Sequence, residues 1–353
     1  MSAEQKKYPR VLIVSHTVLA RNTSMGKTMD TYFSGWDRDA IAQLYIQSEI
    51  PTDPLCVNYF RFTDPDALKS IVQRRRKGTV FTEADVRPDR ADPVEMGNLT
   101  GVYNYGRKRT PLIFLARETL DRAAKILTVN DTMAEVYGRT FGRKCGVVWT
   151  AGNMAEMPEA PDKQGIVYLG DLGLGRNMQL SAIADAMRES ETSGIPEYLD
   201  VYSAETNPDI LEPVKSNPGI RFHGAIPGSQ VREVIHRAKA VIHTESFDPV
   251  IRERVRYSLS TKISDCLASG TGMLAYGPAE AASMDYLIRN EAAFTATSPE
   301  ELREVLPRLF TDEAEYRRVV GNAKALARRN HTPEMTRETV RKALADAAEG
   351  KRE

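Results

Sequence analysis

Residues 258–277 read SLSTKISDCLASGTGMLAYG, and this stretch does most to decide the fold. It begins with polar residues, continues as a short helical pattern from Lys262 to Ala268, and ends in an apolar strand from Met273 to Tyr276. Ser260 and Thr261 precede the helix, where residues of their kind favour the N-cap. A loop, a helix and a buried strand in direct succession indicate a parallel α/β sheet.

The start of that helix is a natural anion site. A helix N-terminus presents unpaired backbone N–H groups and a partial positive charge. Lys262 adds a full charge at the same place, and Asp265 lies one turn further on. A phosphate beside Lys262 and ribose hydroxyls beside Asp265 would together hold a nucleotide. An ordinary capped helix explains the same residues, and the segment by itself leaves both interpretations open.

Outward from this segment, strands and helices alternate regularly. Strands are expected at Ile166–Leu169, Leu199–Tyr202, Ile220–His223, Ala240–His243, Met273–Tyr276 and Ala293–Thr295. Helices are expected at Met178–Glu189, Asp209–Lys215, Gln230–Ala238, Lys262–Ala268, Ala281–Arg289 and Pro299–Phe310. This alternation predicts a doubly wound parallel sheet with right-handed crossovers, whose ligands bind beyond the carboxyl ends of the strands.

The N-terminal part shows a similar alternation with fewer elements. Its expected strands are Val11–Val14, Ala40–Ile46, Leu55–Phe60, Ile126–Val129 and Gly146–Trp149, with helices at Thr110–Ala124 and Thr132–Phe141. We therefore expect two tandem Rossmann-like domains that face each other across a cleft: an abbreviated one at 1–150 and a second at 165–330. A Pro-, Gly- and acid-rich linker at 151–164 separates them, and a C-terminal helix at 331–353 closes the chain.

Composition excludes several classes of protein. The 48 basic and 48 acidic residues cancel, so bulk attraction to nucleic acid is not expected. Three cysteines without CxxC spacing fit a reducing compartment and argue against a zinc or disulfide framework. No apolar run reaches the roughly 18–20 residues of a membrane span, and no convincing export signal is present. We expect a cytoplasmic protein, which the basic run at 73–77 (QRRRK) could bring to anionic lipid at the inner membrane face.

Two glycine-containing loops follow predicted strands. LGDLGLGRN, residues 169–177, lacks the third glycine of a Rossmann fingerprint, but it permits a tight turn beside a phosphate that Arg176 could reach. MGKT, residues 25–28, lacks the first glycine of a P-loop. Gly26 and His16 still lie in a loop that could approach a sugar or phosphate. A plain glycine turn and a structural histidine remain open at both places.

Acidic residues follow one of the central strands of the second domain. Glu245 and Asp248 would lie at the carboxyl edge of the sheet, where carboxylates could hold sugar hydroxyls, although an exposed acidic loop is the plain alternative. The charged run at 252–256 (RERVR) indicates a solvated face or a flexible insert. The Asp-x-Asp patterns at 37–39 and 64–66 precede a strand and cap a helix, so no metal is assigned to either.

Four blocks of the second domain together resemble a known enzyme family. They read GIVYLGDLGLGRNMQL, GIRFHGAIP, AVIHTESFD and STKISDCLASGTGMLAYGP. In order and spacing they are similar to nucleotide-sugar-dependent glycosyltransferases of the two-Rossmann GT-B fold. These belong to the large retaining group (group 1, family 4-like) that assembles capsules, exopolysaccharides and glycolipids. The resemblance covers about residues 165–330 and implies that this domain binds the donor, while the N-terminal domain serves the acceptor.

The resemblance implies roles at the phosphate end of the donor. Arg176 matches the basic residue that contacts the donor diphosphate, and Ser260, Thr261 and Lys262 would hold its phosphates. Glu245 matches the first acid of the family's E-x7-E pattern, which usually lies beside the donor sugar or phosphate.

Further residues carry over more loosely. Asp265 falls where the second acid binds the ribose hydroxyls, and His223-Gly224 sits in the loop that usually lies near the nucleobase. His16 and Gly26 match only the general position of the first-domain loop.

The resemblance thus implies a glycosyltransferase, hexosyltransferase-like, that moves a sugar from a nucleoside diphosphate sugar to a hydroxyl of a glycan or lipid-linked acceptor. It implies retention of the anomeric configuration. It also implies a reaction that needs no metal or other cofactor, because Arg176 and Lys262 would neutralise the leaving diphosphate beside Glu245. Two alternatives stay open. The two acids stand 20 positions apart rather than eight and the first domain is short, which fits a catalytically weak binding subunit that partners an active transferase. A nucleotide-sugar epimerase of the same fold is the other.

Overall fold

The computed structural model describes residues 8–19, 24–46, 50–51, 55–63, 65–66, 69, 73, 78–82, 85, 119–155 and 163–352. They divide into two compact units. Unit 1 takes its described residues from Met1–Leu127, Tyr137–Val148 and Glu334–Glu353, and unit 2 from Thr128–Val136 and Trp149–Pro333. The C-terminal helix from residue 334 onward thus belongs to the same unit as the N-terminal sheet.

Unit 2 is built on a six-stranded sheet in the order β12-β11-β10-β7-β8-β9. The strands are β7 (Ile166–Leu169), β8 (Leu199–Tyr202), β9 (Ile220–Gly224), β10 (Ala240–Thr244), β11 (Gly272–Tyr276) and β12 (Phe294–Ala296). Every neighbouring pair is parallel, with Ala240 opposite both Ile166 and Gly272. This is the strand order of a dinucleotide-binding fold, and the predicted doubly wound sheet is confirmed.

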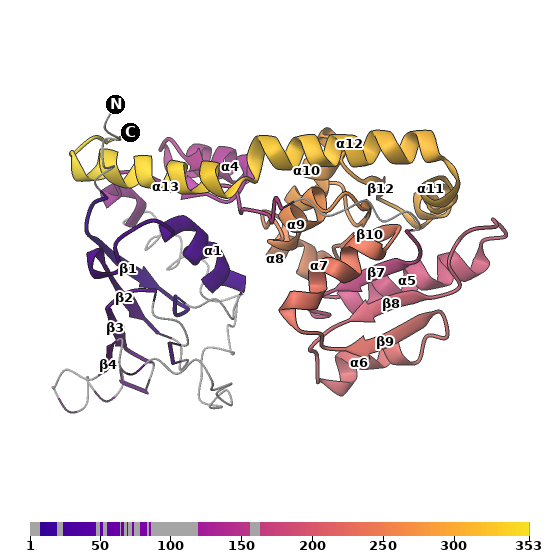
Figure 1. Ribbon diagram of the computed structural model, residues 1–353, viewed down its shortest axis with the longest axis horizontal. Coiled ribbons are helices and arrows are strands. Elements are labelled where there is room, and N and C mark those ends of the chain that lie inside the picture. The colour runs from indigo at the N-terminus through magenta and orange to yellow at the C-terminus, as the bar shows by residue number, and fades with distance from the viewer. Residues whose placement is uncertain are drawn as a thin grey trace. The chain divides into compact units, whose positions relative to one another are not determined.

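Helices connect these strands and cover both faces of the sheet (Figure 1). They are α5 (Arg176–Glu189), α6 (Pro208–Lys215), α7 (Gly228–Arg237), α8 (Pro249–Val255), α9 (Lys262–Ala268), α10 (Ala282–Arg289), α11 (Pro299–Thr311) and α12 (Glu313–Asn330). Polar residues start several of them: Asn207, Asp248, Ser298 and Asp312 accept a hydrogen bond from a backbone N–H of the first turn.

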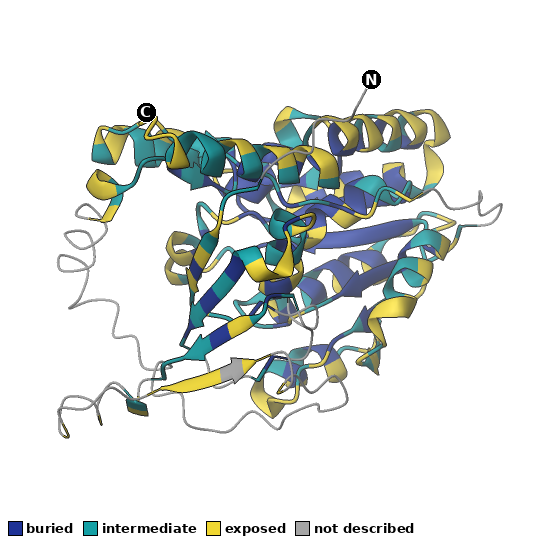
Figure 2. Ribbon diagram, turned by 60° about the vertical axis from the view of Figure 1, so that its left-hand side comes forward, coloured by how far each residue is buried: buried dark blue, intermediate teal, exposed yellow. Residues whose placement is uncertain are grey.

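The central strands are buried on both sides, as their apolar runs predict for a parallel sheet. Every residue of β7, β10 and β11 is buried, and central strands of the sheet are drawn in dark blue in Figure 2. Successive residues face opposite cores: Ile166 and Tyr168 pack with α5, α6 and α11, whereas Val167 and Leu169 pack with α7, α9 and α10.

Unit 1 contains a four-stranded sheet in the order β1-β2-β3-β4. Its strands are β1 (Val11–Ser15), β2 (Ile41–Tyr45), β3 (Asn58–Arg61) and β4 (Thr79–Thr82), and β4 alone runs antiparallel to its neighbour. Helix α1 (Ser24–Phe33) and the short 3-10 turn Arg38–Ala40 lie between β1 and β2, and α4 (Asp131–Phe141) lies between β5 (Leu127–Thr128) and β6 (Gly146–Val147). Helix α13 (Pro333–Ala348) contributes Val340 to the core of this unit.

Of the two alternatives for residues 252–256, the flexible insert is wrong, because residues up to Val255 form helix α8; Glu253 and Arg254 are exposed, as on a solvated face, and Val255 is buried. The RRRK part of the basic run, residues 74–77, lies outside the described residues, as does Asp64 of the second Asp-x-Asp pattern.

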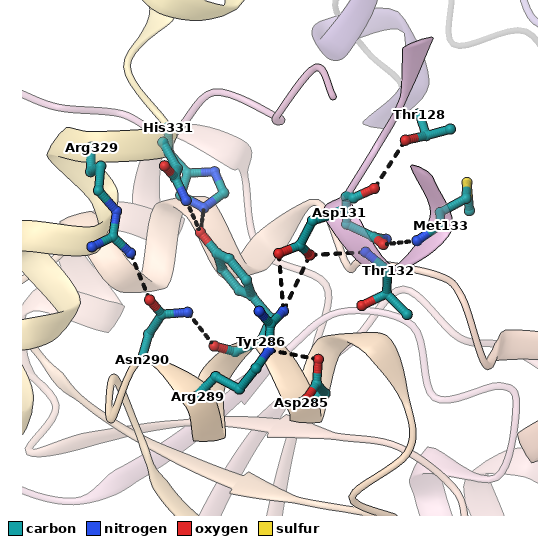
Figure 3. A network of polar contacts seen from close by, with 12 residues as sticks. Thr128, Asp131, Thr132, Met133, Asp285, Tyr286, Arg289, Asn290, Arg329 and His331 are labelled. Atoms are coloured by element: carbon teal, nitrogen blue, oxygen red, sulfur yellow. Dashed lines mark hydrogen bonds and ion pairs between the residues drawn. The ribbon is translucent and has the colours of Figure 1, made fainter. Parts of the chain in front are cut away.

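A buried histidine joins several segments of unit 2 (Figure 3). His331 has no solvent exposure; its Nδ1 lies 2.7 Å from the Thr150 carbonyl oxygen and its Nε2 lies 2.9 Å from the Tyr286 hydroxyl. Asn330 Nδ2 donates to the same hydroxyl at 2.9 Å, and Trp149 stacks on Tyr286 at 4.9 Å. A neutral ring satisfies this network, since Nδ1–H donates to the carbonyl and Nε2 accepts from Tyr286. Burial accordingly lowers the pKa of His331 to about 4.

We expect His331 to make unfolding sensitive to mild acid. Between pH 6.5 and about 4 the unfolded chain binds a proton on this residue that the folded chain refuses, so stability falls as pH falls through that window. His331 accounts for a loss of about 3 kcal/mol in the free energy of unfolding across this window. His331→Phe should lose roughly 2–4 kcal/mol at neutral pH, because two buried polar groups lose their partner. It should also flatten the acid slope in urea unfolding. His16→Gln, which replaces an exposed histidine, is the control. An acid slope that stays unchanged in His331→Phe would refute the assignment of this pH dependence to His331.

Candidate functional site

The carboxyl ends of β7 and β10 form the switch point of the unit 2 sheet. The chain leaves β7 toward β8 on one side and leaves β10 toward β11 on the other, so the two crossovers part between neighbouring strands. Side chains that follow these two strands line the space that the crossovers leave open, which is where ligands bind in such sheets.

Glu245 stands directly after β10 and is buried, with a side-chain exposure of 4%. Its Oε1 accepts from Ser283 Oγ at 3.1 Å and lies 3.5 Å from His243 Nε2. Its Oε2 lies 4.0 Å from Arg176 Nη2 and has no hydrogen-bond partner in the described part of the chain. A Cβ on Gly277 would lie 3.0 Å from the Glu245 Cβ, so the next strand end packs closely against this residue.

Arg176 opens helix α5 after a glycine turn. Gly175 has φ +73°, a conformation that side chains rarely adopt, and a Cβ there would lie 2.5 Å from Ser246 Oγ. The turn points Arg176 at the switch point, where its Nη1 binds Asp171 Oδ2 at 3.2 Å. The guanidinium is therefore shared between an exposed carboxylate, Asp171, and the buried carboxylate of Glu245.

Lys262, the first residue of α9, reaches the end of β7. Its Nζ donates to the Leu169 carbonyl oxygen at 2.9 Å and lies 5.0 Å from the centre of the Tyr168 ring. Gly170 makes this possible, because a Cβ there would lie 1.7 Å from the Lys262 ammonium. Part of the residue is exposed, while its ammonium is held at the Leu169 carbonyl oxygen.

The environment shifts the pKa values of these groups. Burial raises the pKa of Glu245, against the lowering effect of Arg176, the Ser283 hydrogen bond and Lys262. Burial lowers the pKa of Lys262, and the nearby charge of Arg176 lowers it further. Burial, with both cations, lowers the pKa of His243 to about 3, so this histidine is neutral. Two cations thus stand beside one buried carboxylate and one neutral imidazole, an arrangement suited to an anion that also carries hydroxyl groups.

The remaining residues predicted on α9 are placed as follows. Thr261 is the N-cap, but its side chain makes no capping hydrogen bond, contrary to the sequence expectation, and the Ser260 carbonyl oxygen accepts from Ile263 N at 3.1 Å. Asp265 is exposed, and its Oδ1 accepts from the Asn153 backbone N–H at 2.8 Å. Its carboxylate therefore also holds the segment that enters unit 2.

His223 and Gly224 end strand β9, two strands away from β7. His223 stacks on Tyr202 with ring centres 4.6 Å apart, and its Nε2 lies 2.6 Å from Asp200 Oδ1. Gly224 has φ +72°. Asp248 is exposed and caps α8 through Val250 N and Ile251 N, at 2.9 and 3.0 Å, so its carboxylate already has a structural task.

His16 and Gly26 lie in unit 1. His16 is exposed after β1, in a loop held by Gln43, whose Nε2 donates to Ser15 Oγ at 2.7 Å and to the Thr17 carbonyl oxygen at 2.9 Å. Gly26 is buried within α1.

Sequence reasoning missed three residues of this site. His243 is the last residue of a predicted apolar strand, Ser283 lies in the predicted helix Ala281–Arg289 without being singled out, and Gly170 was treated only as a turn residue. The sequence held a signal for His243. It is a polar residue in the apolar run AVIHT, which is buried throughout, and a buried polar residue needs a partner. Ser283 and Gly170 come close to the other site residues only in the folded chain, so no signal in the sequence pointed to them.

Gly170 offers a test of how Lys262 is seated. Gly170→Ala should displace the ammonium and weaken binding of an anionic ligand at least tenfold, with a loss of stability of order 1–3 kcal/mol because φ is +142°. Gly194→Ala is the matched control, since Gly194 has φ +94° and no atom near its missing Cβ. Calorimetric titration and urea unfolding of both variants separate the effects. Equal ligand affinity in the two variants would contradict this role of Gly170.

Among the described residues, no group of three or more His, Cys, Asp or Glu side chains is arranged to hold a metal ion. Among the helices of the described ranges, none combines the length and apolarity needed to cross a membrane.

Residues 193–341 match the family model described as Glycosyl transferase-like. No curated protein matches the chain. Among solved structures, HepE of Anabaena in complex with UDP and glucose superposes with a TM-score of 0.65 at 11% identity, over 96% of this chain and 100% of that one. Trehalose 6-phosphate synthase from Burkholderia multivorans superposes with a TM-score of 0.63 at 11% identity, over 97% of this chain and 99% of that one. Sucrose-phosphate synthase from Thermosynechococcus elongatus superposes with a TM-score of 0.61 at 12% identity, over 97% of this chain and 100% of that one. The chain therefore has the GT-B fold, with two Rossmann-like domains.

The extent of the match varies among these structures. With TarM the chain aligns over 65% of its own length and spans only 45% of the TarM chain, at a TM-score of 0.51. By family model over its C-terminal part and by fold over nearly its whole length, the chain is thus similar to glycosyltransferases.

Proposed function

We propose that the chain transfers a glycosyl group from a nucleoside diphosphate sugar to a hydroxyl acceptor. The observation that carries this proposal is the convergence of Arg176, Lys262 and the buried Glu245 at the switch point of a parallel sheet. Two cations suit a diphosphate leaving group. A buried carboxylate with one oxygen to which no described residue donates a hydrogen bond suits the hydroxyls of a sugar. The glycosyl transferase-like match of residues 193–341 supports the same reaction class.

The two cations would act as the bond to the anomeric carbon breaks. Negative charge then develops on the leaving diphosphate, and Arg176 and Lys262 stabilise it from fixed positions. We assign this task to the protein's own cations rather than to a divalent metal. We also propose retention, with the acceptor attacking from the face that the diphosphate leaves and the diphosphate oxygen helping to take its proton.

The nucleoside would extend along the carboxyl edge of the sheet. We assign the phosphates also to Ser260 and Thr261 and the ribose hydroxyls to Asp265, one turn beyond Lys262. The flat pair of His223 on Tyr202 is suited to a nucleobase, and the positive φ of Gly224 lets the chain turn beside it.

The acceptor is proposed to be a glycan or a lipid-linked sugar, and the protein to work in the cytoplasm or at the inner membrane face. TarM has been solved in complex with fondaparinux, alpha-GlcNAc-glycerol and UDP, and WaaG is a glycosyltransferase of lipopolysaccharide biosynthesis. Both share this fold, which makes a role in polysaccharide or glycolipid assembly a reasonable expectation for this chain.

Thermal unfolding with a panel of nucleoside diphosphates tests the donor site. In the presence of EDTA, one member of the panel is expected to raise the apparent melting temperature. Ligand at a hundredfold excess over its Kd adds about 2.7 kcal/mol to stability, which corresponds to a few degrees. The panel also names the base. Absence of any shift would contradict the proposal, and a shift that requires magnesium would contradict its metal-independent form.

Product analysis separates the rival functions. A transferase consumes the nucleotide sugar and releases diphosphate much faster when a suitable hydroxyl acceptor is added. An epimerase converts the sugar with no acceptor present. A binding subunit retains the thermal shift and shows no turnover unless a partner transferase is added.

A further inference from the structure

Two buried polar atoms of the site have no hydrogen-bond partner in the described part of the chain, and they belong to adjacent groups. They are His243 Nε2 and Glu245 Oε2. The two side chains approach each other at 3.5 Å, between His243 Nε2 and Glu245 Oε1, which is too long for a good hydrogen bond. Buried groups normally find partners, so this pair requires an explanation.

One added proton on Glu245 would give His243 Nε2 a partner. His243 is neutral, since burial and two nearby cations keep its pKa near 3. With its N–H on Nδ1, a neutral His243 can only accept at Nε2, and a carboxylate can only accept as well. If Glu245 takes a proton on Oε1, the oxygen 3.5 Å from His243 Nε2, its O–H can donate to that nitrogen while Oε1 still accepts from Ser283 Oγ, and Oε2 stays available to a ligand.

The cations decide when that proton binds. Groups that face Glu245 are Arg176 from α5, Lys262 from α9, His243 from β10, Ser283 from α10 and, beyond Arg176, Asp171 after β7. Arg176 lies 4.0 Å from Glu245 without a hydrogen bond, so its hold on this carboxylate is weak. A diphosphate would engage Arg176 and Lys262 through stronger charge-assisted hydrogen bonds and would add negative charge beside Glu245. Both changes favour the protonated carboxyl.

We propose that binding of a nucleoside diphosphate at Arg176 and Lys262 is coupled to uptake of one proton by the His243–Glu245 pair. The proton comes from solvent, Glu245 becomes a neutral carboxyl, and its O–H donates to His243 Nε2. No other bond forms or breaks. The inference rests on the proposed donor site and makes His243 a positioning residue for Glu245. Since the complex holds one more proton than its free components, the Kd falls as pH falls, by up to tenfold per pH unit.

Calorimetric titration with UDP, GDP and ADP tests this coupling. At about pH 7.5 the terminal phosphate keeps most of its second charge. Titrations in two buffers with different ionisation enthalpies give the number of protons taken up. The wild-type chain should take up close to one proton per diphosphate bound. Glu245→Gln should bind diphosphate with no uptake, His243→Phe should show reduced uptake, and His236→Gln, outside the site, should behave as wild type.

The outcomes are distinguishable. If the wild type binds diphosphate without proton uptake, the coupling is overturned and the donor site still holds. Full proton uptake by Glu245→Gln would overturn the coupling in the same way. Failure of all three nucleotides to bind overturns both the donor site and the coupling. The pH dependence of the wild-type Kd gives the same answer with no variant, so a folding defect in His243→Phe does not decide the result.

Discussion

Replacing Lys262 with methionine is expected to lower kcat/KM for the nucleotide sugar by roughly 10²- to 10³-fold, the loss typical of removing one preorganised charge-stabilising group. Methionine keeps much of the chain length, while the ammonium is lost together with its contact with the Tyr168 ring. The hydrogen bond to the Leu169 carbonyl oxygen is lost with it, at a cost of about 1 kcal/mol in stability. Because the charge develops as the donor bond breaks, kcat should fall along with kcat/KM.

Lys324→Met is the matched control for this variant. Lys324 is an exposed lysine of α12 that lies beside Gly270, at the amino end of β11, whereas Lys262 reaches the carboxyl end of β7. It should keep the wild-type kinetics. Steady-state assays of both proteins decide the matter, and near-normal kcat/KM in Lys262→Met would remove Lys262 from the mechanism.

Glu245→Gln should lower kcat/KM by about 10²-fold while binding of the free nucleoside diphosphate stays at least as tight. The carboxylate is assigned to the sugar and can accept at both of its oxygens. The glutamine amide has a single acceptor oxygen, so either a sugar hydroxyl or Ser283 loses its acceptor. Removing a negative charge beside Arg176 also favours the diphosphate. The effect should therefore separate turnover from diphosphate affinity.

The comparison for Glu245 comes from α8. Glu253→Gln removes an exposed carboxylate eight residues further along and should change neither quantity. Initial rates with the nucleotide sugar and titration with the diphosphate give the two numbers. A parallel loss of both in Glu245→Gln would place the carboxylate at the phosphates or in the fold instead of at the sugar.

The fold of unit 2 could be predicted well from the sequence, because each strand and helix carries its own local signal. Runs such as AVIHT and GMLAY are buried throughout, as central parallel strands are, and Asn207, Ser298 and Asp312 mark helix starts. The strand order could not be read locally, since it depends on which crossovers pack on which face. Helix α8 was missed because its charged residues, Arg252 to Arg254, outweigh the two apolar residues that precede them.

The site was predicted in part. Arg176, Glu245 and Lys262 were expected at the carboxyl edge of the sheet, and the fold brings them together there. Their roles toward a donor stay predictions. The competing contacts were invisible in the sequence: Asp171 binds Arg176, Asn153 donates to Asp265, and Asp248 caps a helix. Such contacts join residues whose proximity only the folded chain creates.

The most direct test of the central claim is calorimetric titration of the wild-type chain and of Lys262→Met with nucleoside diphosphates in EDTA. If the switch point of unit 2 is the donor site, one diphosphate binds the wild type without metal, and Lys262→Met binds it at least tenfold more weakly, about 1.4 kcal/mol. Equal affinity for the two proteins, or no binding to the wild type, would contradict the account.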